Sequence, residues 1–396
     1  MSYSKKNKPT FIDLFCGAGG LSKGLELAGL RCVGSLDFSQ VVCRTHKHNF
    51  PDSVCVESDI SKMSPRNFEK KIKRKRVDFI VGGPPCPTFS TVGGPKINSL
   101  LKGGEATLFD DRRNFLFKDF FKYIQHFNPK GFLMENVPNF MTKYDGKIFR
   151  QTIDRVRELG YHITGERVMV LNSANYGVPQ KRKRMFLIAH KKGYRFDYPK
   201  ITHNEKGENL FKDAKNFVDV RSAISDLPKI TDNPNKINKM EYSKFKGLSP
   251  FQILMRKNNR STTVRNNVCR LTNERAIKVF SHMKQGSKYD DLPKRVKDIL
   301  GYRDDIFKDR LKRLSYSEPS WTVVAHLGMD GYMFIHPDEP RTISVREAAR
   351  LQSFPDDFVF IGNLSETYHM IGNAVPVLIA KQLGKELAKM VKKQRA

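Results

Sequence analysis

Short apolar runs and amphipathic stretches alternate along the first half of the chain. The apolar runs predict strands over residues 10–14, 31–36, 53–56, 77–81 and 131–135. The stretches between them carry apolar residues at helical spacing, which predicts helices over 21–30, 38–49, 114–127 and 148–159. Two further strand patterns follow at 162–171 and 185–190. Such alternation is typical of an α/β fold in which helices cover a mostly parallel sheet.

This pattern breaks down between residues 191 and 328. Polar, Asn-rich and basic loops dominate there, with 30 Lys and Arg against 16 Asp and Glu, an excess of 14. Regular patterns return with helices predicted over 344–352 and 375–392. We therefore expect two domains, one formed by residues 9–190 and 329–396 and a smaller basic one formed by 191–328.

The net charge of the chain indicates which class of molecule the protein binds. The 396 residues include 71 Lys and Arg against 41 Asp and Glu, a net charge of +30. Self-repulsion of this size opposes compaction unless a polyanion screens it, and nucleic acid is the expected polyanion. The run KKIKRKR at residues 70–76 fits either a nucleic-acid patch or a solvated helix end before a strand, and the second is the commoner meaning of such a run.

The cysteines and the terminal sequence favour a reducing compartment. The six cysteines, at positions 16, 32, 43, 55, 86 and 269, form no CxxC pair and are too sparse for a disulfide framework or a zinc site. The first ten residues lack the apolar region of a signal peptide, and the longest charge-free stretch, 79–95, is interrupted by Gly and Pro. These features predict a cytoplasmic protein with no membrane segment and no metal.

A DLFCGAGG turn directly follows the first predicted strand. Its glycines let a ligand approach the backbone, and the helix that follows offers amide donors. Ser22 occupies the place of the third glycine in GxGxxG, which weakens a dinucleotide interpretation. Asp37 at the end of the second strand can accept both hydroxyls of a ribose, and Phe38 can stack on an adenine. Asp59 and Ile60 after the third strand could reach the adenine's exocyclic amine, although each of these residues, taken singly, is more often a surface or core residue. A purely structural turn fits the glycines about equally well.

A second loop, GGPPCPTFS, follows the fourth predicted strand and contains Cys86. Most free cysteines are inert small hydrophobes. This one lies on a stiff, polar loop at the carboxyl edge of the sheet, where ligands of α/β sheets bind. We therefore favour a nucleophile over a structural cysteine.

Three later motifs add polar groups. Glu135 ends the fifth strand at the same edge, where burial would favour its protonated form and let it act as an acid. In QKRKR, alternate residues of an extended chain would project Gln180, Arg182 and Arg184 together, although a solvated basic strand start is the alternative. GNAVP predicts a turn that opens the last helix.

The chain resembles the DNA (cytosine-5) methyltransferases of bacteria over residues 10–190 and 341–392. DLFCGAGG, GGPPCPTFS, ENV, QKRKR, RTISVREAARLQSFPDDF and GNAVP occur in the order of that family's motifs. The resemblance implies a Rossmann-like, doubly wound mixed α/β sheet of the S-adenosylmethionine-dependent methyltransferase type, with a smaller basic target-recognition domain. Asp37, Phe38 and Pro87 stand where the family more often has Glu, Trp and Gln. The first two exchanges keep the carboxylate and the aromatic face.

The resemblance also implies the reaction. A methyl group would pass from S-adenosylmethionine to C5 of a flipped-out cytosine in a specific duplex DNA sequence, through a covalent adduct of Cys86 with C6, while the loop 91–113 closes over the base. The implied catalytic residues are Cys86, Glu135, Arg182 and Arg184. The implied cofactor-binding residues are Phe15, Gly17, Gly19, Gly20, Asp37, Phe38, Asp59, Ile60, Pro85, Leu116, Asn373 and Val375. The implied DNA-binding residues are Ser90, Asn136, Gln180 and Thr322.

Other functions remain as alternatives. The same chemistry on cytosine in transfer RNA is the nearest one, although the large basic segment favours duplex DNA. A DNA-binding module without catalysis conflicts with the intact Cys86 and Glu135, and a nicotinamide dehydrogenase conflicts with the missing third glycine. The expected partner is double-stranded DNA at the bacterial nucleoid, bound by a monomer. A cognate restriction endonuclease, where one exists, would act separately.

Overall fold

The computed structural model describes residues 8–85, 115–163, 168–207, 213–230, 239–243, 247–259, 261–301, 311–329 and 331–392. Cys86, Ser90 and the loop 91–113 lie outside these residues. The chain forms two compact units, each described here by itself. Unit 1 comprises Met1–Asn172, Lys183–Lys200 and Val377–Ala396, and unit 2 comprises Ser173–Arg182 and Ile201–Pro376. The domain boundaries expected from the sequence stay a prediction.

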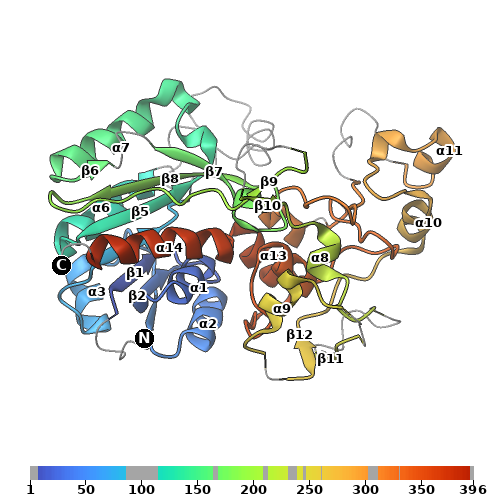
Figure 1. Cartoon of the computed structure of the whole chain (residues 1–396), viewed down its shortest axis with the longest axis horizontal. Coiled ribbons are helices and arrows are strands. Elements are labelled where there is room, and N and C mark those ends of the chain that lie inside the picture. Colours follow the sequence, from blue (N-terminus) through green and yellow to red (C-terminus); the bar gives the residue numbers. More distant parts are fainter. Residues whose placement is uncertain are drawn as a thin grey trace. The chain divides into compact units, whose positions relative to one another are not determined.

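Unit 1 is built on a mixed sheet of eight strands in the order β3-β2-β1-β4-β5-β8-β6, with β7 also paired to β8 (Figure 1). Strands β1 to β5 run parallel, and β8 runs antiparallel to β5, β6 and β7. A mostly parallel α/β sheet is therefore confirmed. The bounds are β1 Thr10–Leu14, β2 Arg31–Asp37, β3 Val54–Glu57, β4 Phe79–Gly82, β5 Gly131–Asn136, β6 His162–Ile163, β7 Met169–Asn172 and β8 Lys183–His190.

The order of the strands creates a switch point between β1 and β4. From β1 the chain winds outward through β2 to β3 at the edge of the sheet, then returns to place β4 on the other side of β1. Ligands of open α/β sheets bind at the carboxyl ends of the strands beside such a reversal. Both loops singled out in the sequence start there, because the glycine turn follows β1 and the loop that leads to Cys86 follows β4.

The helices of unit 1 pack through aromatic and small residues. Phe120 and Phe121 share one apolar core with Ile12, Ile80 and Phe132 of the sheet. Gly24 lets α14 approach α1, because a Cβ there would lie 2.4 Å from the Cβ of Ala380. The helices are α1 Gly20–Leu27, α2 Gln40–Asn49, α3 Pro65–Ile72, α6 Leu116–Phe127, α7 Lys147–Glu158 and α14 Val377–Lys392.

Unit 2 contains short helices and two small sheets. Several of its helices begin with a capping box, at Ser249, Ser344 and Asn363. These side chains accept hydrogen bonds from backbone amides that the first turn of a helix leaves unpaired. Its strands are β9 His203–Asn204, β10 Lys215–Asn216, β11 Lys239–Glu241 and β12 Thr263–Arg265. Its helices are α8 Val220–Ile224, α9 Pro250–Arg256, α10 Glu274–His282, α11 Lys294–Lys297, α12 Val345–Leu351 and α13 Leu364–Asn373.

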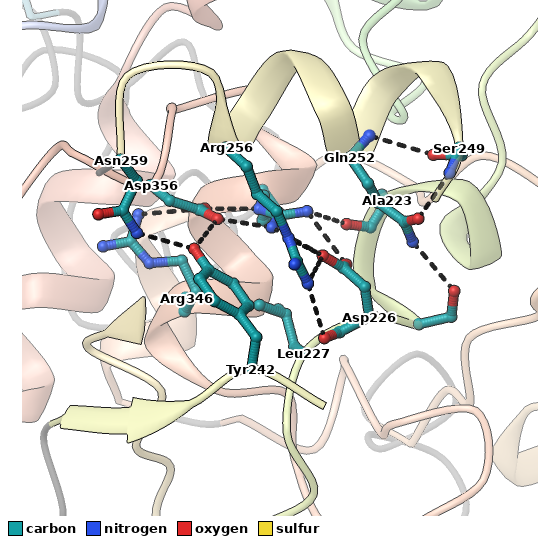
Figure 2. Close-up of polar contacts among 12 residues, drawn as sticks. Ala223, Asp226, Leu227, Tyr242, Ser249, Gln252, Arg256, Asn259, Arg346 and Asp356 are labelled. Carbon is teal, nitrogen blue, oxygen red and sulfur yellow. Dashed lines mark hydrogen bonds and ion pairs between the residues drawn. The ribbon is translucent and has the colours of Figure 1, made fainter. Parts of the chain in front are cut away.

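A buried ionic cluster joins α8, α9 and α12 (Figure 2). Arg350 of α12 donates to both oxygens of Asp356 at 2.6 Å each and to Asp226 at 3.2 and 3.3 Å. Arg256 of α9 donates to the same Asp226 at 2.7 Å and lies over the ring of Tyr242, whose hydroxyl donates to Asp356. Arg350, Asp226 and Asp356 are almost fully buried. We call these five residues the Asp226 cluster.

Two sequence expectations differ from the structure. The strand expected over 162–171 is two strands, β6 and β7, each paired with β8. The turn expected to open the last helix is limited to residues 374–376, because Gly372 and Asn373 complete α13, a helix that the pattern did not predict. Among the described residues, no helix combines the length and apolar character needed to cross a bilayer.

Candidate active site

The glycine turn folds back on the end of β2. The amides of Phe15 and Cys16 both donate to the carbonyl of Leu36, at 2.9 and 3.2 Å. Phe15, Gly17 and Gly19 all have positive φ, at 62°, 51° and 92°. A Cβ at Gly19 would lie 2.5 Å from the ring of Phe50, whereas a Cβ at Gly17 would meet nothing within 4 Å. Gly19 is therefore required by packing, and Gly17 leaves open space that a ligand can use.

Asp37 connects this turn to β2. Its two carboxylate oxygens accept hydrogen bonds from the amides of Gly17 and Ser39, each at 3.0 Å. Burial raises the pKa of Asp37, and these amide donors oppose the rise. Phe38 beside it is 77% exposed, an unusual position for a large apolar ring. A fixed carboxylate, an exposed aromatic face and open backbone fit the ribose and adenine of S-adenosylmethionine.

The other expected cofactor residues have mixed environments. Asp59 accepts hydrogen bonds from the amide and hydroxyl of Ser61, at 2.9 and 2.8 Å, and Ile60 is buried. Leu116 is half-buried at the start of α6, and Pro85 is exposed. Asn373 and Val375 belong to unit 2, where Asn373 is exposed and Val375 is buried. Gly20 is the first residue of α1.

Glu135 and Arg184 form an ion pair at the carboxyl edge of the sheet. Glu135 lies on β5 and Arg184 on the neighbouring antiparallel β8, and Arg184 Nε lies 3.1 Å from Glu135 Oε1. The two side chains are only 13% and 16% exposed. Burial lowers the pKa of the Arg184 guanidinium, and the carboxylate of Glu135 counteracts this. The pair therefore holds a carboxyl group and a guanidinium in fixed positions at the carboxyl edge of the sheet.

The loop after β4 is fastened to this pair. A Cβ at Gly83 would lie 2.9 Å from Glu135 Oε2, so a side chain there would push the carboxylate out of its present position. Asn136 Nδ2 donates to the carbonyl of Pro84 at 3.1 Å, and Asn136 is 4% exposed. Its Oδ1 accepts from the amide of Val137 at 2.8 Å. The chain is thus held beside Glu135 up to Pro85, the residue directly before Cys86.

Gln180, Arg182 and Thr322 belong to unit 2, whereas Arg184 belongs to unit 1. Gln180 and Arg182 are almost fully buried. Gln180 binds the carbonyl of Leu351 at 3.0 Å and Gln352 Oε1 at 2.9 Å, and Arg182 donates to the carbonyls of Val323 and Gly372 at 2.6 and 3.1 Å. Thr322 donates to the carbonyl of Lys181 at 2.9 Å. These contacts hold segments of unit 2 together.

A buried polar network behind the glycine turn was not identified from the sequence. Ser22 donates to Asp13 at 2.6 Å, and the ring of His46 lies 3.5 Å from the hydroxyl of Ser22 and 3.2 Å from that of Ser35. We call these four residues the Asp13 network. Burial raises the pKa of Asp13 to about 7 and lowers that of His46 to about 4. The spacing of Val42 and His46, four residues apart on α2, was the one signal that His46 faces inward.

Within the described ranges, no group of three or more His, Cys, Asp or Glu residues is arranged to hold a metal ion.

Comparisons with known proteins agree on one family. The model of the C-5 cytosine-specific DNA methylases matches residues 9–389. Type II methyltransferase M.AgeI of Thalassovita gelatinovora is 32% identical, with 96% of this chain and 98% of that protein aligned. M1.HphI of Haemophilus parahaemolyticus is also 32% identical, over 96% of this chain and 87% of its own.

Solved structures share the fold. A crystal structure of a putative DNA modification methyltransferase encoded within a prophage (E. coli) has a TM-score of 0.74 at 26% identity, covering 97% of this chain and all of that one. Spodoptera frugiperda DNMT2, at 17% identity and a TM-score of 0.60, shows the fold alone. The chain therefore belongs to the family of C-5 cytosine-specific DNA methylases, and is a DNA (cytosine-5-)-methyltransferase similar to the type II enzymes of restriction-modification systems.

Proposed function

We propose that this protein methylates C5 of a cytosine flipped out of a specific duplex DNA sequence, through a covalent bond between Cys86 and C6. One observation carries the proposal. The half-buried ion pair of Glu135 and Arg184 places the Glu135 carboxylate against Gly83, on a loop that Asn136 holds and that continues directly into Cys86. A thiol, a carboxyl group and a guanidinium are the three groups that the reaction requires.

The chemistry assigns a role to each group. C5 of cytosine is a poor nucleophile, and addition of the Cys86 thiolate to C6 makes C5 electron-rich, as in an enamine. In its protonated form Glu135 donates a proton toward N3 and holds the exocyclic amine, which neutralises charge that develops on the ring. Arg184 binds O2 of the base, and Arg182 holds the segment before β8 in place. After methylation the C5 proton leaves to solvent, and the bond to Cys86 breaks to give 5-methylcytosine.

Methyltransferases of this family use S-adenosylmethionine, which supplies an electrophilic methyl group. In this chain Asp37 accepts the ribose hydroxyls while the amides of Gly17 and Ser39 keep its carboxylate oriented. Phe38 offers its exposed ring to the adenine. The remaining contacts come from Phe15, Gly19, Gly20, Asp59, Ile60, Pro85, Leu116, Asn373 and Val375.

Access to C6 requires the base to leave the duplex, at a cost of a few kcal/mol. The excess of 14 positive charges between residues 191 and 328 supports a role for that segment in binding and reading the DNA. Thr322 inside that segment, and Ser90, Asn136 and Gln180 outside it, are the further proposed DNA-contacting or loop-supporting residues.

The test uses a trapped intermediate. An oligonucleotide with 5-fluorocytosine at the target should bind the wild-type protein covalently, because fluorine cannot leave C5 as a proton does. Cys86→Ser should bind DNA, form no adduct and transfer no methyl group. Cys269→Ser, which changes a buried cysteine of unit 2, should behave as the wild type. Full methylation by Cys86→Ser would overturn the assignment, and bisulfite sequencing of DNA from expressing cells would report the site that is modified.

A further inference from the structure

Six exposed cations lie in the last turn of α3 and in the segment between α3 and β4. They are Lys70, Lys71, Lys73, Arg74, Lys75 and Arg76, and we call them the amino-edge patch. Residues 62–76 contain eight Lys and Arg but one acid, Glu69, and that carboxylate is 2.6 Å from the ring of His126. Within the described part of the chain, none of the six side chains has an ion pair or a hydrogen bond. The patch therefore presents uncompensated charge to solvent.

The position of the patch separates it from the candidate active site. It directly precedes β4, whereas Gly83 directly follows β4. The four residues of β4 alone span about 13 Å at 3.3 Å per residue. The patch thus lies at the amino edge of the parallel strands, and Glu135 and Gly83 lie at the carboxyl edge.

Further cations lie along the same amino edge. The start of β5 pairs with the end of β8, because Gly131 is opposite His190. Lys130 precedes Gly131, Lys191 follows His190, and the Lys191 amide donates to the Lys130 carbonyl at 3.0 Å. The Lys130 amide donates in turn to the carbonyl of Asp78, two residues after the patch. The Lys130 ammonium lies 2.6 Å from the carboxylate of Asp78, so Lys130 adds no net charge, and of these two lysines only Lys191 adds a positive charge to the edge.

The local structure explains only part of this charge. Lys70 and Lys71 occupy the last turn of α3, where the helix dipole favours cations. Lys73 has the left-handed conformation that ends the helix, and Arg74, Lys75 and Arg76 lie beyond it. The dipole falls off within one turn, so it provides no reason for these last three cations. Adjacent like charges repel one another, and a bound polyanion relieves that repulsion.

We propose that the amino-edge patch binds phosphates of a second segment of duplex DNA, distinct from the segment whose cytosine reaches Glu135. The choice of DNA rests on the proposed function. Contacts of this kind are independent of sequence, because they neutralise backbone phosphates and release counterions. On a long DNA molecule a second contact raises the effective concentration of the enzyme near its target, and a duplex that covers only the target cannot provide it.

The experiment compares two substrates that contain the same single target. One is a duplex just long enough to cover the target, and the other is a plasmid. The variant Arg74→Gln/Arg76→Gln should keep the wild-type kcat and KM on the short duplex, while its KM on the plasmid rises several-fold. The log–log salt dependence of binding to non-target plasmid should become shallower by about 1.8, or 0.9 for each lost phosphate contact.

A matched control removes the same charge elsewhere. Arg44→Gln/Lys47→Gln changes two exposed cations of α2 and should leave the ratio of the two KM values unchanged. Thermal unfolding of both variants would confirm that each is folded.

The proposal fails if the plasmid KM of Arg74→Gln/Arg76→Gln equals that of the wild type, or if KM rises equally on both substrates. It also fails if plasmid binding is unchanged while binding to vesicles of acidic lipid is lost. Methylation of the short duplex by the wild type tests the proposed function separately, since the salt dependence of plasmid binding is measured without turnover.

Discussion

Replacing Asp226 with Asn should destabilise unit 2 substantially. Asp226 is fully buried and is the shared acceptor for Arg350 and Arg256. Removing one partner from a buried ion pair costs roughly 3–5 kcal/mol, because the other charge stays desolvated. Here Arg350 keeps both contacts to Asp356, and the Arg256 side chain is 21% exposed and can gain water. We therefore expect a loss at the lower end, about 3 kcal/mol.

The single tryptophan makes this loss measurable. Trp321 is the only Trp of the chain and lies in unit 2, where its indole donates to the carbonyl of Met333 at 3.0 Å. Urea unfolding followed by tryptophan fluorescence therefore reports on the unit that contains the Asp226 cluster. Tyr242→Phe, which removes one hydrogen bond to the carboxylate of Asp356, should cost about 1.5 kcal/mol.

The charge-matched control is Asp290→Asn, at an exposed position of the same unit. A surface change of this kind should shift the free energy of unfolding by less than about 0.5 kcal/mol. If Asp226→Asn shifts the midpoint no further than Asp290→Asn at an unchanged m-value, the Asp226 cluster contributes no net stability and the reasoning is refuted.

Three further predictions concern the reaction. Glu135→Gln should lower kcat by about 10²-fold or more with little change in DNA affinity, because it removes the proton donor; an unaltered single-turnover rate would assign the proton to another group. Asp37→Ala should weaken S-adenosylmethionine binding by about 10- to 100-fold in calorimetry, since hydrogen bonds to a charged group contribute roughly 1.5–3 kcal/mol; unchanged affinity would remove Asp37 from the pocket. Grafting residues 191–328 onto a relative should transfer the sequence preference, with a salt slope near −0.9 per phosphate contact; methylation of the recipient's original site would contradict the recognition role.

The sequence was most informative for the buried strands. Residues 79–82 of β4 are buried, and most of them are visible in the sequence as the apolar run expected over 77–81. The bounds of β1 were predicted correctly. Because the carboxyl ends of parallel strands meet at one edge of a sheet, the predicted strands also placed Asp37, Glu135 and the loop before Cys86 at the same edge.

Unit 2 was much less predictable, for a physical reason. Its interior includes Arg346, Arg350 and Asp226, which a search for apolar patterns assigns to the surface. Arg350 and Asp226 are 124 residues apart, and nothing near either residue indicates its partner. Helices such as α9, with seven residues, are stabilised by the cap at Ser249 and by tertiary contacts, and are too short for a periodic signal.

The positions of Gln180 and Arg182 illustrate a similar difficulty. Alternation along an extended chain predicts that these residues share a face with Arg184. Only the last of the three lies within β8, which starts at Lys183. The other two belong to the segment before it, and their side chains bind carbonyls of segments more than 140 residues away in the sequence.

The Asp13 network moves a proton within the protein when the protein folds. In the unfolded chain between pH 4 and 6.5, Asp13 is ionised and His46 is protonated, because their ordinary pKa values are 3.8 and 6.5. In the folded protein the pKa of Asp13 is about 7 and that of His46 is about 4, so the same proton resides on Asp13. Alone, the lowered pKa of His46 would reduce stability as pH falls through this window, and the raised pKa of Asp13 would reduce it as pH rises.

Both states bind one proton across the pair, so the two slopes cancel and the network adds no pH dependence to unfolding in this range. Folding thus replaces a hydrated carboxylate and a hydrated imidazolium with two neutral groups in the interior. The Asp13 network behind the glycine turn therefore keeps its contribution to stability under mild acidification, a property that neither residue would confer without the other.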